Sequence, residues 1–308
     1  MKSTSRNSLV ALSAAAALAG FSGCSEPKPE KQEAGTTTVA TVNYPLAYFA
    51  ERIGGEEVEV SFPAPTNEDP AYWLPEADTV AAFQDADVIL ANGAGYAQWL
   101  ERVSLPMSKV VDTSAGFSDQ YISVDGSITH SHGPGGEHAH GGTAFTTWLD
   151  MQHATAQAAA VCQAISKLCP AQKAVFQQRF EELKTDLATL EKQFTDSVGD
   201  RSQEPIVFSH PVFQYMAHRH HLNGRAVHWE PDEPPSEDQW QELATLLKKH
   251  PAEWMIWEGE PMRETADRLK ELGVASVVFD PCGNAPETGD YITMMQHNIQ
   301  NMRSVYGN

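Results

Sequence analysis

Short apolar segments alternate with longer amphipathic segments along most of this 308-residue chain. In the first half, β-rich segments at residues 37–42, 58–62, 88–90 and 109–112 are separated by helical patterns at 44–55, 79–83 and 96–103. In the second half, apolar segments at 206–208, 226–229, 254–257 and 277–279 alternate with helical patterns that begin at Pro211 and cover 237–249, 263–272 and 290–305. Such alternation predicts parallel sheets flanked by helices.

A long helical pattern separates the two halves. Helices are expected at residues 154–168 and 171–198. In the second of these, apolar residues recur at spacings of 4, 3, 4, 3 and 4: Phe176, Phe180, Leu183, Leu187, Leu190 and Phe194. This spacing places them on one face along roughly 40 Å of helix. We interpret the stripe as core contact rather than a coiled-coil dimer, because it is not sustained elsewhere.

The predicted fold class is therefore α/β, with two lobes bridged by a long rigid helix. Each lobe is expected to be a mainly parallel sheet flanked by helices. The expected segments are a signal peptide at 1–23, a tether at 24–36, an N-terminal lobe at 37–150, a helical linker at 151–199 and a C-terminal lobe at 200–308.

The N-terminus has the pattern of an export signal. Lys2 and Arg6 precede an apolar run at residues 9–21 that is too short to span a bilayer comfortably. The run leads into Phe21-Ser22-Gly23-Cys24, which resembles a bacterial lipobox whose cysteine is lipidated. The alternative is an ordinary cleaved signal beside an incidental cysteine. Residues 25–36 are nearly free of apolar side chains, which predicts a flexible tether.

The chain is strongly acidic, with 41 Asp and Glu against 21 Lys and Arg and a formal charge of −20. Nucleic-acid binding needs clustered basic residues, so the composition argues against that class of partner. An acidic surface attracts cations over long range, although salt screens most of the attraction. A solvated acidic surface without such a role explains the charge equally well.

Three cysteines follow Cys24 in the sequence: Cys162, Cys169 and Cys282. On one continuous helix, Cys162 and Cys169 would lie about two turns, or roughly 10 Å, apart, which is too far for a disulfide. A disulfide between Cys169 and Cys282 stays open, because Pro170 is where a helix would normally end. The odd count leaves at least one free thiol or a partner outside the chain.

Four histidines lie within eleven residues of the first half, in a Gly-rich stretch at 130–140: His130, His132, His138 and His140. Imidazole is the commonest metal ligand in proteins, and it titrates near neutral pH. A Gly-rich backbone lets several imidazoles converge on one ion. The stretch therefore predicts metal contact. The alternative is a solvated loop whose histidines bind nothing.

Polar residues also follow three of the expected strands. His210 follows the segment 206–208, Asp280 follows 277–279, and Glu258 follows 254–257. Ligands of open α/β sheets bind outside the carboxyl ends of the strands, so His210 and Asp280 are candidates to share one metal ion. Glu258 is the next candidate, and its alternative role is to cap a helix or pair with Arg263.

Other chemistry-bearing patterns carry less information. His218 and His221 are expected on one face of a helix, where an ordinary polar surface is the favoured interpretation. The sequence contains no Gly-rich phosphate loop, no His-Glu-x-x-His motif and no Gly-x-Ser-x-Gly elbow. We therefore expect a binding protein rather than an enzyme.

Several segments together resemble the zinc- and manganese-specific solute-binding proteins of bacterial ABC importers, the ZnuA-like proteins of cluster A-I. The resemblance covers nearly the whole chain after the export signal. It includes the histidine-rich loop, which is typical of zinc-specific members. The segments that carry it are 43–46 (Asn-Tyr-Pro-Leu), 86–93 (Ala-Asp-Val-Ile-Leu-Ala-Asn-Gly), 208–215 (Phe-Ser-His-Pro-Val-Phe-Gln-Tyr), 233–236 (Glu-Pro-Pro-Ser) and 290–298.

The resemblance implies two α/β lobes with a metal ion in the cleft and two ligand positions in each lobe. It carries the second-lobe ligands onto His210 and Asp280. At the first-lobe positions the family's usual histidines are replaced by Ala71 and Thr146. Alanine cannot bind a metal and threonine is a poor zinc ligand. We hypothesise that the histidine-rich loop supplies the missing imidazoles through His138 and His140, which are nearest in sequence to Thr146.

The resulting hypothesis is a lipid-anchored extracytoplasmic protein, expected to be monomeric, that captures Zn²⁺ and delivers it to an ABC importer permease. Zinc is preferred over Mn²⁺ because imidazoles outnumber carboxylates among the candidate ligands. One alternative is a protein of the same fold whose degenerate site binds an organic or metal-chelate ligand, with Tyr72, Trp73 and Trp148 lining the cleft. Another is a metal buffer or chaperone that works without a permease.

Overall fold

The structure is a computed structural model that describes residues 36–124, 129–131, 137–139 and 142–307. The expected signal peptide, Cys24, residues 25–35 of the expected tether, His132 and His140 lie outside these ranges. The described elements form two parallel sheets flanked by helices, together with a long helix, so the predicted fold class is confirmed.

The first lobe is built on a four-stranded parallel sheet in the order β2-β1-β3-β4. Its strands are β1 Thr37–Thr41, β2 Val58–Ser61, β3 Val88–Ala91 and β4 Val110–Asp112, and its helices are α1 Tyr44–Gly54 and α2 Ala77–Asp85. Asn43 fixes the start of α1, because its side chain accepts a hydrogen bond from the Leu46 N–H at 3.2 Å. Asn43 also donates to the side chain of Asn92, so polar residues after β1 and β3 are tied together inside the lobe.

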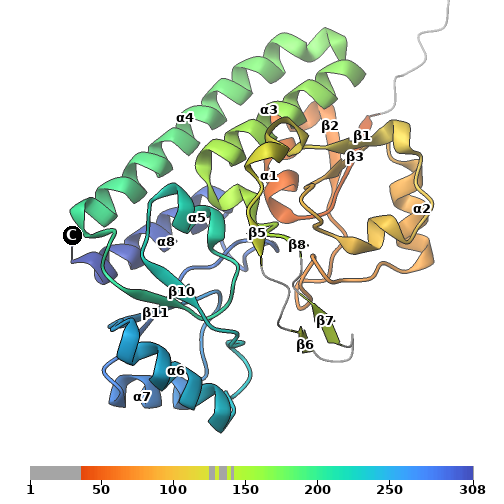
Figure 1. Cartoon of the computed structure of the whole chain (residues 1–308). Helices are drawn as coiled ribbons and strands as arrows, with labels where there is room; N and C mark the ends of the chain where they lie inside the picture. Colours follow the sequence, from red (N-terminus) through yellow and green to blue (C-terminus); the bar gives the residue numbers. More distant parts are fainter. Residues whose placement is uncertain (1–35, 125–128, 132–136, 140–141, 308) are drawn as a thin grey trace, which may run out of the picture. The chain divides into compact units, whose positions relative to one another are not determined.

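The second lobe repeats the arrangement with a parallel sheet in the order β10-β9-β11-β12. Its strands are β9 Ile206–Phe208, β10 Gly224–Ala226, β11 Trp254–Trp257 and β12 Ala275–Val278, and its helices are α5 Gln214–Arg219, α6 Glu237–Lys249, α7 Arg263–Glu271 and α8 Tyr291–Tyr306. Capping boxes begin α6 at Ser236 and α8 at Asp290. Figure 1 shows α6 and α7 together at one end of the lobe.

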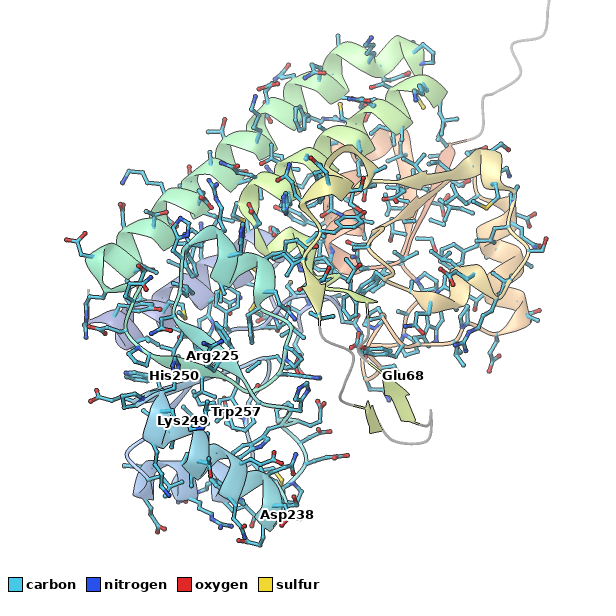
Figure 2. All side chains as sticks on the ribbon, viewed as in Figure 1. Glu68, Arg225, Asp238, Lys249, His250 and Trp257 are labelled. Atoms are coloured by element: carbon cyan, nitrogen blue, oxygen red, sulfur yellow. The ribbon has the colours of Figure 1, made fainter. Side chains whose placement is uncertain are left out.

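Successive side chains of the central strands of the second sheet point to opposite faces, and each face belongs to a different hydrophobic core. Phe208 and Ile256 belong to the large core that continues into the first lobe. Val207, Met255 and Trp257 belong to a second core, which includes residues of α6 and α7. Buried His250 at the end of α6, labelled with Trp257 in Figure 2, lies with Nε2 2.9 Å from the carbonyl of Ile206. This contact ties the end of α6 to the start of β9.

Two helices connect the lobes, α3 Met151–Leu168 and α4 Lys173–Val198. The 26 residues of α4 span about 39 Å, and the helix packs against both α3 and α8. All six members of its apolar stripe are buried in the core of the same chain. The interpretation of the stripe as core contact is confirmed. None of the described helices combines the length and apolar character needed to cross a bilayer.

Short strands follow the first sheet. β5 Ser123–Val124 pairs with β8 Gly142–Thr143, and β6 Thr129–Ser131 pairs with β7 Glu137–Ala139. Both pairs are antiparallel, and in the second pair the backbone of His130 lies opposite that of His138. Part of the histidine-rich loop is therefore a hairpin in its backbone.

Three local expectations were wrong. The helix expected at 96–103 is only a single 3₁₀ turn, Gln98–Glu101, because Ala97 before it has a φ of 54°, which a right-handed helix does not admit. The strand expected at 226–229 lies earlier, at Gly224–Ala226. His218 and His221 do not share a helical face, because α5 ends at Arg219 and His221 has a φ of 53°.

The cysteines described by the structure are free thiols. Cys162 and Cys282 are buried, and Sγ of the half-buried Cys169 lies 3.1 Å from Oγ1 of Thr37. The disulfide between Cys169 and Cys282 that the sequence left open is therefore not present.

Candidate metal centre

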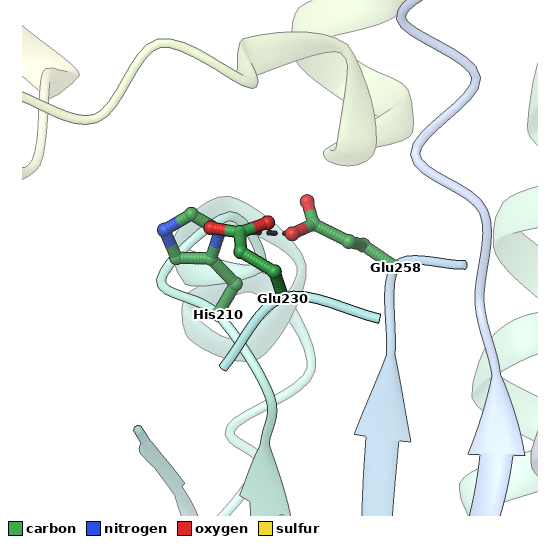
Figure 3. A group of neighbouring side chains, drawn as sticks. All are labelled: His210, Glu230 and Glu258. Carbon is green, nitrogen blue, oxygen red and sulfur yellow. Dashed lines mark hydrogen bonds and ion pairs between the residues drawn. The ribbon is translucent and has the colours of Figure 1, made fainter. Parts of the chain in front are cut away.

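The carboxyl edge of the second sheet brings together three side chains of the kinds that bind metals in proteins. His210 follows β9, Glu230 follows β10, and Glu258 follows β11 directly. Strands β10, β9 and β11 are parallel neighbours, so their chain exits lie side by side at one edge. Figure 3 shows the three side chains converging above this edge. We call them the donor trio.

The geometry of the donor trio is compact. One ligand atom from each residue lies within 4.8 Å of the other two. Nδ1 of His210 lies 2.8 Å from Oε1 of Glu258 and 3.5 Å from Oε1 of Glu230. The His210 side chain is 4% exposed, whereas those of Glu230 and Glu258 are 21% and 20% exposed. One nitrogen and two carboxylate oxygens thus converge at a partly shielded position.

The two glutamates carry raised pKa values. Burial, together with the negative charge of Glu258, raises the pKa of Glu230 to about 8. Burial raises the pKa of Glu258 to about 7, with added repulsion from Asp280 and Asp232. Both shifts arise because negative charges gather away from water. A bound cation would favour the ionised forms, so the electrostatics fit a cation site.

Asp280, the second ligand expected from the sequence, lies close to the donor trio but not within it. Its charge raises the pKa of Glu258, and its Oδ1 accepts a hydrogen bond from the Cys282 N–H at 2.6 Å. Burial raises its own pKa. In the described arrangement Asp280 therefore contributes negative charge near Glu258 and is not one of the three converging donors.

Glu230 and His228 are not among the site residues predicted from the sequence. Glu230 directly follows the strand expected at 226–229, so the rule that selected Glu258 would have selected it too. The sequence alone gives no signal at His228, which has no other histidine beside it. Its ring centroid lies 5.9 Å from that of His210, because β10 is the neighbour of β9.

The loop histidines are only partly described. His130 and His138 lie in β6 and β7 by their backbone, whereas His132 and His140 lie outside the described residues. The structure therefore does not test the hypothesis that His138 and His140 bind metal.

The first-lobe positions at which the resemblance places histidines have other roles here. Ala71 is 2% exposed within the core. The hydroxyl of buried Thr146 donates to the carbonyl of Val212, which joins the first lobe to the segment after His210. Neither residue belongs to the donor trio.

A cavity of about 840 Å³ opens in front of the donor trio. From the first lobe it is lined by four aromatic residues, which we call the aromatic wall: Tyr72, Tyr96, Phe145 and Trp148. Their rings meet edge to face, with centroid distances of 6.1 Å for Tyr72–Phe145 and 5.3 Å for Tyr96–Phe145. Glu68, labelled in Figure 2, also lines the cavity.

The trio and the aromatic wall face a common space. Burial raises the pKa of Tyr72, and the negative charges of Asp69, Glu258 and Glu230 raise it further. Among the described lining residues there is no Lys or Arg, whereas Glu68, Asp69, Glu230, Asp232 and Glu258 are acidic. The cavity therefore favours a cationic ligand at the end formed by the donor trio.

Comparison with known proteins gives related chains of the same architecture. The zinc-binding lipoprotein AdcA of Streptococcus pneumoniae (strain ATCC BAA-255 / R6) is 24% identical over 287 residues, covering 89% of this chain and 56% of AdcA. The high-affinity zinc uptake system protein ZnuA of Bacillus subtilis (strain 168) is 24% identical over 285 residues and 86% of each chain. This chain therefore spans about half the length of the AdcA relatives, but most of ZnuA.

The crystal structure of Zn(II)-bound AdcA from Streptococcus pneumoniae superposes with a TM-score of 0.75 at 22% identity, covering 89% of this chain and 58% of that one. This similarity supports the two-lobed fold. A family model described as ZnuA, zinc-uptake complex component A, periplasmic, matches residues 39–305, which include the donor trio and both sheets except the first two residues of β1. The chain belongs to the family of ZnuA, the periplasmic component A of zinc-uptake complexes.

Proposed function

We propose that this protein captures Zn²⁺ outside the cytoplasm and delivers it to the permease of an ABC importer, without chemical conversion. The observation that carries the proposal is the donor trio, which the carboxyl edge of a parallel sheet brings together in a chain of the ZnuA family. The relatives named for zinc binding and zinc uptake support the choice of metal.

The donor trio provides the core of the proposed site. Zinc is bound in proteins by imidazole nitrogen and carboxylate oxygen, most often in four-coordinate geometry. His210, Glu230 and Glu258 supply three such donors, and Nδ1 of His210 faces both carboxylates. Three donors leave at least one position of the metal open toward the cavity.

We assign further donors to Asp280 and to the histidine-rich loop. Asp280 is the second-lobe candidate that the family resemblance implies, and its charge acts on Glu258 of the donor trio. His138 and His140 are our candidates for the remaining ligands, at the positions of the metal that face the first lobe. They would bind when zinc arrives as the hydrated ion. His130 and His132 are the next candidates, since the hairpin pairs His130 with His138 in its backbone.

The choice between zinc and manganese depends on which of these donors bind. The donor trio contains two carboxylates and one imidazole, a balance that also suits Mn²⁺. Imidazoles from the loop would move the preference toward Zn²⁺. We therefore assign Zn²⁺ as the cargo, with Mn²⁺ as the alternative.

Export and anchoring follow from the N-terminal sequence. A signal peptide at 1–23, lipidation of Cys24 and a tether up to residue 36 would hold the two lobes at a membrane surface outside the cytoplasm. The protein would act as a monomer that meets a membrane permease.

The test of this function is elemental analysis of protein purified without chelators. We expect about one zinc per chain in the parent protein and much less in a Glu230→Gln/Glu258→Gln variant. Deleting residues 130–141 should lower the zinc content without abolishing it, because the donor trio remains. A metal content that the double substitution does not change would contradict the proposed function.

A further inference from the structure

The space in front of the donor trio is much larger than a metal ion needs. A water molecule occupies roughly 30 Å³ of liquid, so a zinc ion with six waters fills roughly 200 Å³. The cavity measures about 840 Å³, within the range of sites that hold organic ligands. Most of its volume therefore lies beyond the coordination sphere of the metal.

The wall opposite the donor trio is suited to an organic surface. At the first-lobe positions of the family's ligands this chain has Ala71, which is buried, and Thr146, whose hydroxyl is bonded to Val212. Tyr72 and Phe145, the half-buried members of the aromatic wall, offer ring surface to the cavity beside them. Aromatic side chains of this kind bind flat or apolar groups rather than a hydrated ion.

The charge of the cavity restricts what such a ligand can carry. Five acidic residues and no Lys or Arg are found among the described lining residues. A free chelator with several negative charges would be repelled, whereas the same chelator neutralised by Zn²⁺ would not. The metal would then join the organic ligand to His210, Glu230 and Glu258.

We infer that the site also takes zinc as a complex with a small organic chelator of low net charge. The chelator supplies the nitrogen or oxygen donors on the side of the metal that faces the first lobe, and its organic part lies against Tyr72 and Phe145. This inference rests on the proposed function, because zinc at the donor trio anchors the complex. When zinc binds as this complex, the loop histidines are not needed as ligands of the metal.

The probe is the neutral 1:1 complex of zinc with N-benzyliminodiacetate, a tridentate chelator that leaves positions open for the donor trio and carries one phenyl ring. Metal-stripped full-length protein is equilibrated with the radiolabelled complex, and bound zinc and chelator are counted after gel filtration. We expect one zinc and one N-benzyliminodiacetate per chain. N-benzyliminodiacetate without zinc, and the zinc–EDTA complex with all its donor positions filled, should not be retained.

Variants separate the aromatic wall from the metal donors. Tyr72→Ala should weaken retention of the zinc complex roughly fivefold to tenfold, the size of an aromatic contact, with bare-zinc affinity unchanged. Tyr72→Phe should retain the complex, and Leu74→Ala, at an exposed position outside the cavity lining, should match the parent. His138→Ala/His140→Ala should weaken binding of bare zinc but leave binding of the complex unchanged.

Four results would overturn the inference. Retention of one zinc with no chelator would show a bare-ion site and leave the proposed function intact. Equal retention of zinc–EDTA would show that the metal does not bridge ligand and protein. A loss of bare-zinc affinity in Tyr72→Phe would show that the phenol is itself a metal donor. Binding of neither zinc nor its complex would overturn the proposed function along with the inference.

Discussion

Nδ1 of His210 lies 2.8 Å from Oε1 of Glu258, although the two residues are 48 positions apart in the sequence. The contact exists because β9 and β11 are parallel neighbours whose carboxyl ends meet at one edge of the sheet. In the metal-free protein a proton on His210 can bridge the two groups. In the zinc-loaded protein the metal would replace that proton.

Replacing Glu258 with glutamine should weaken zinc binding by roughly 100-fold, because an amide oxygen is neutral and a poorer zinc ligand than a carboxylate. Competition titration with a fluorescent zinc chelator at pH 7.5 measures the change. Glu260→Gln is the matched control, since Glu260 is exposed and lies two residues away. Equal affinities for the Glu258→Gln variant and its control would remove Glu258 from the site.

The same substitution should stabilise the metal-free protein at pH 8. Burial raises the pKa of Glu258 to about 7 in the folded protein, whereas its pKa in the unfolded chain is near 4.5. The free energy of unfolding therefore falls as the pH rises from 4.5 to 7, and the full loss is present above pH 7. We expect Glu258→Gln to raise the free energy of unfolding by about 1–3 kcal/mol at pH 8, with little difference at pH 4. Urea unfolding of the zinc-free proteins measures it. A variant less stable than the parent at pH 8 would contradict this account.

Zinc affinity should rise between pH 6 and pH 8. The pKa values of Glu230 and Glu258, raised to about 8 and about 7, mean that both carboxyls lose protons over this window, and zinc binds the deprotonated forms. Calorimetry at pH 7 in two buffers of different ionisation enthalpy should show release of about one to two protons per zinc. Proton release of zero, with an affinity independent of pH, would exclude these carboxylates as ligands.

Replacing His138 and His140 with alanine should weaken binding of bare zinc by about tenfold or more, because two imidazoles leave the site. The donor trio should still hold the metal, so stoichiometry stays at one at high protein concentration. The control is His297→Ala, outside both the loop and the donor trio. An affinity equal to that of the parent would show that these two loop histidines do not bind the metal at the donor trio.

His220 should make the fold sensitive to acid. Its side chain is 7% exposed and its ring lies 4.1 Å from that of Phe194. Burial, followed by the charges of Arg219 and His221, lowers its pKa to about 4. In the unfolded chain His220 takes up a proton near pH 6.5, whereas in the folded chain it does so only near pH 4. The free energy of unfolding therefore falls as the pH decreases from 6.5 toward 4.

Between pH 7.5 and pH 5, His220 should lower the free energy of unfolding of the parent protein by up to about 2 kcal/mol. The nearby Glu191 carboxylate acts in the opposite direction, because it favours the protonated imidazole. His220→Phe should lose less stability than the parent over this range in urea unfolding. The exposed His218→Asn variant serves as control. Identical pH profiles for His220→Phe and the parent would rule out His220 as the source.

The fold was predictable because its signals are local. Strand–helix alternation and the stripe on α4 each arise within a few turns of chain. Two side chains of the donor trio were also within reach, since His210 and Glu258 follow strands that pattern alone identifies. The rule for strand ends applies to Glu230 as well, and applying it at every strand would have identified the complete trio.

The rest of the site depends on contacts between distant segments. Asp280 follows β12, and β11 separates β12 from β9, the strand before His210. This sheet order cannot be read from the sequence. His228 joins the site for the same reason, because β10 is next to β9. The tie between Thr146 and Val212 forms only when the two lobes meet, so composition near Thr146 gave no sign of it.

The most direct test is a crystal structure of the full chain loaded with one equivalent of zinc, with anomalous scattering recorded on both sides of the zinc absorption edge. The account predicts a single strong zinc peak at the carboxyl edge of the second sheet, within about 2.0–2.2 Å of His210 nitrogen and of the Glu230 and Glu258 oxygens. A zinc peak bound only by the histidine-rich loop, with those three side chains still paired to one another, would contradict it.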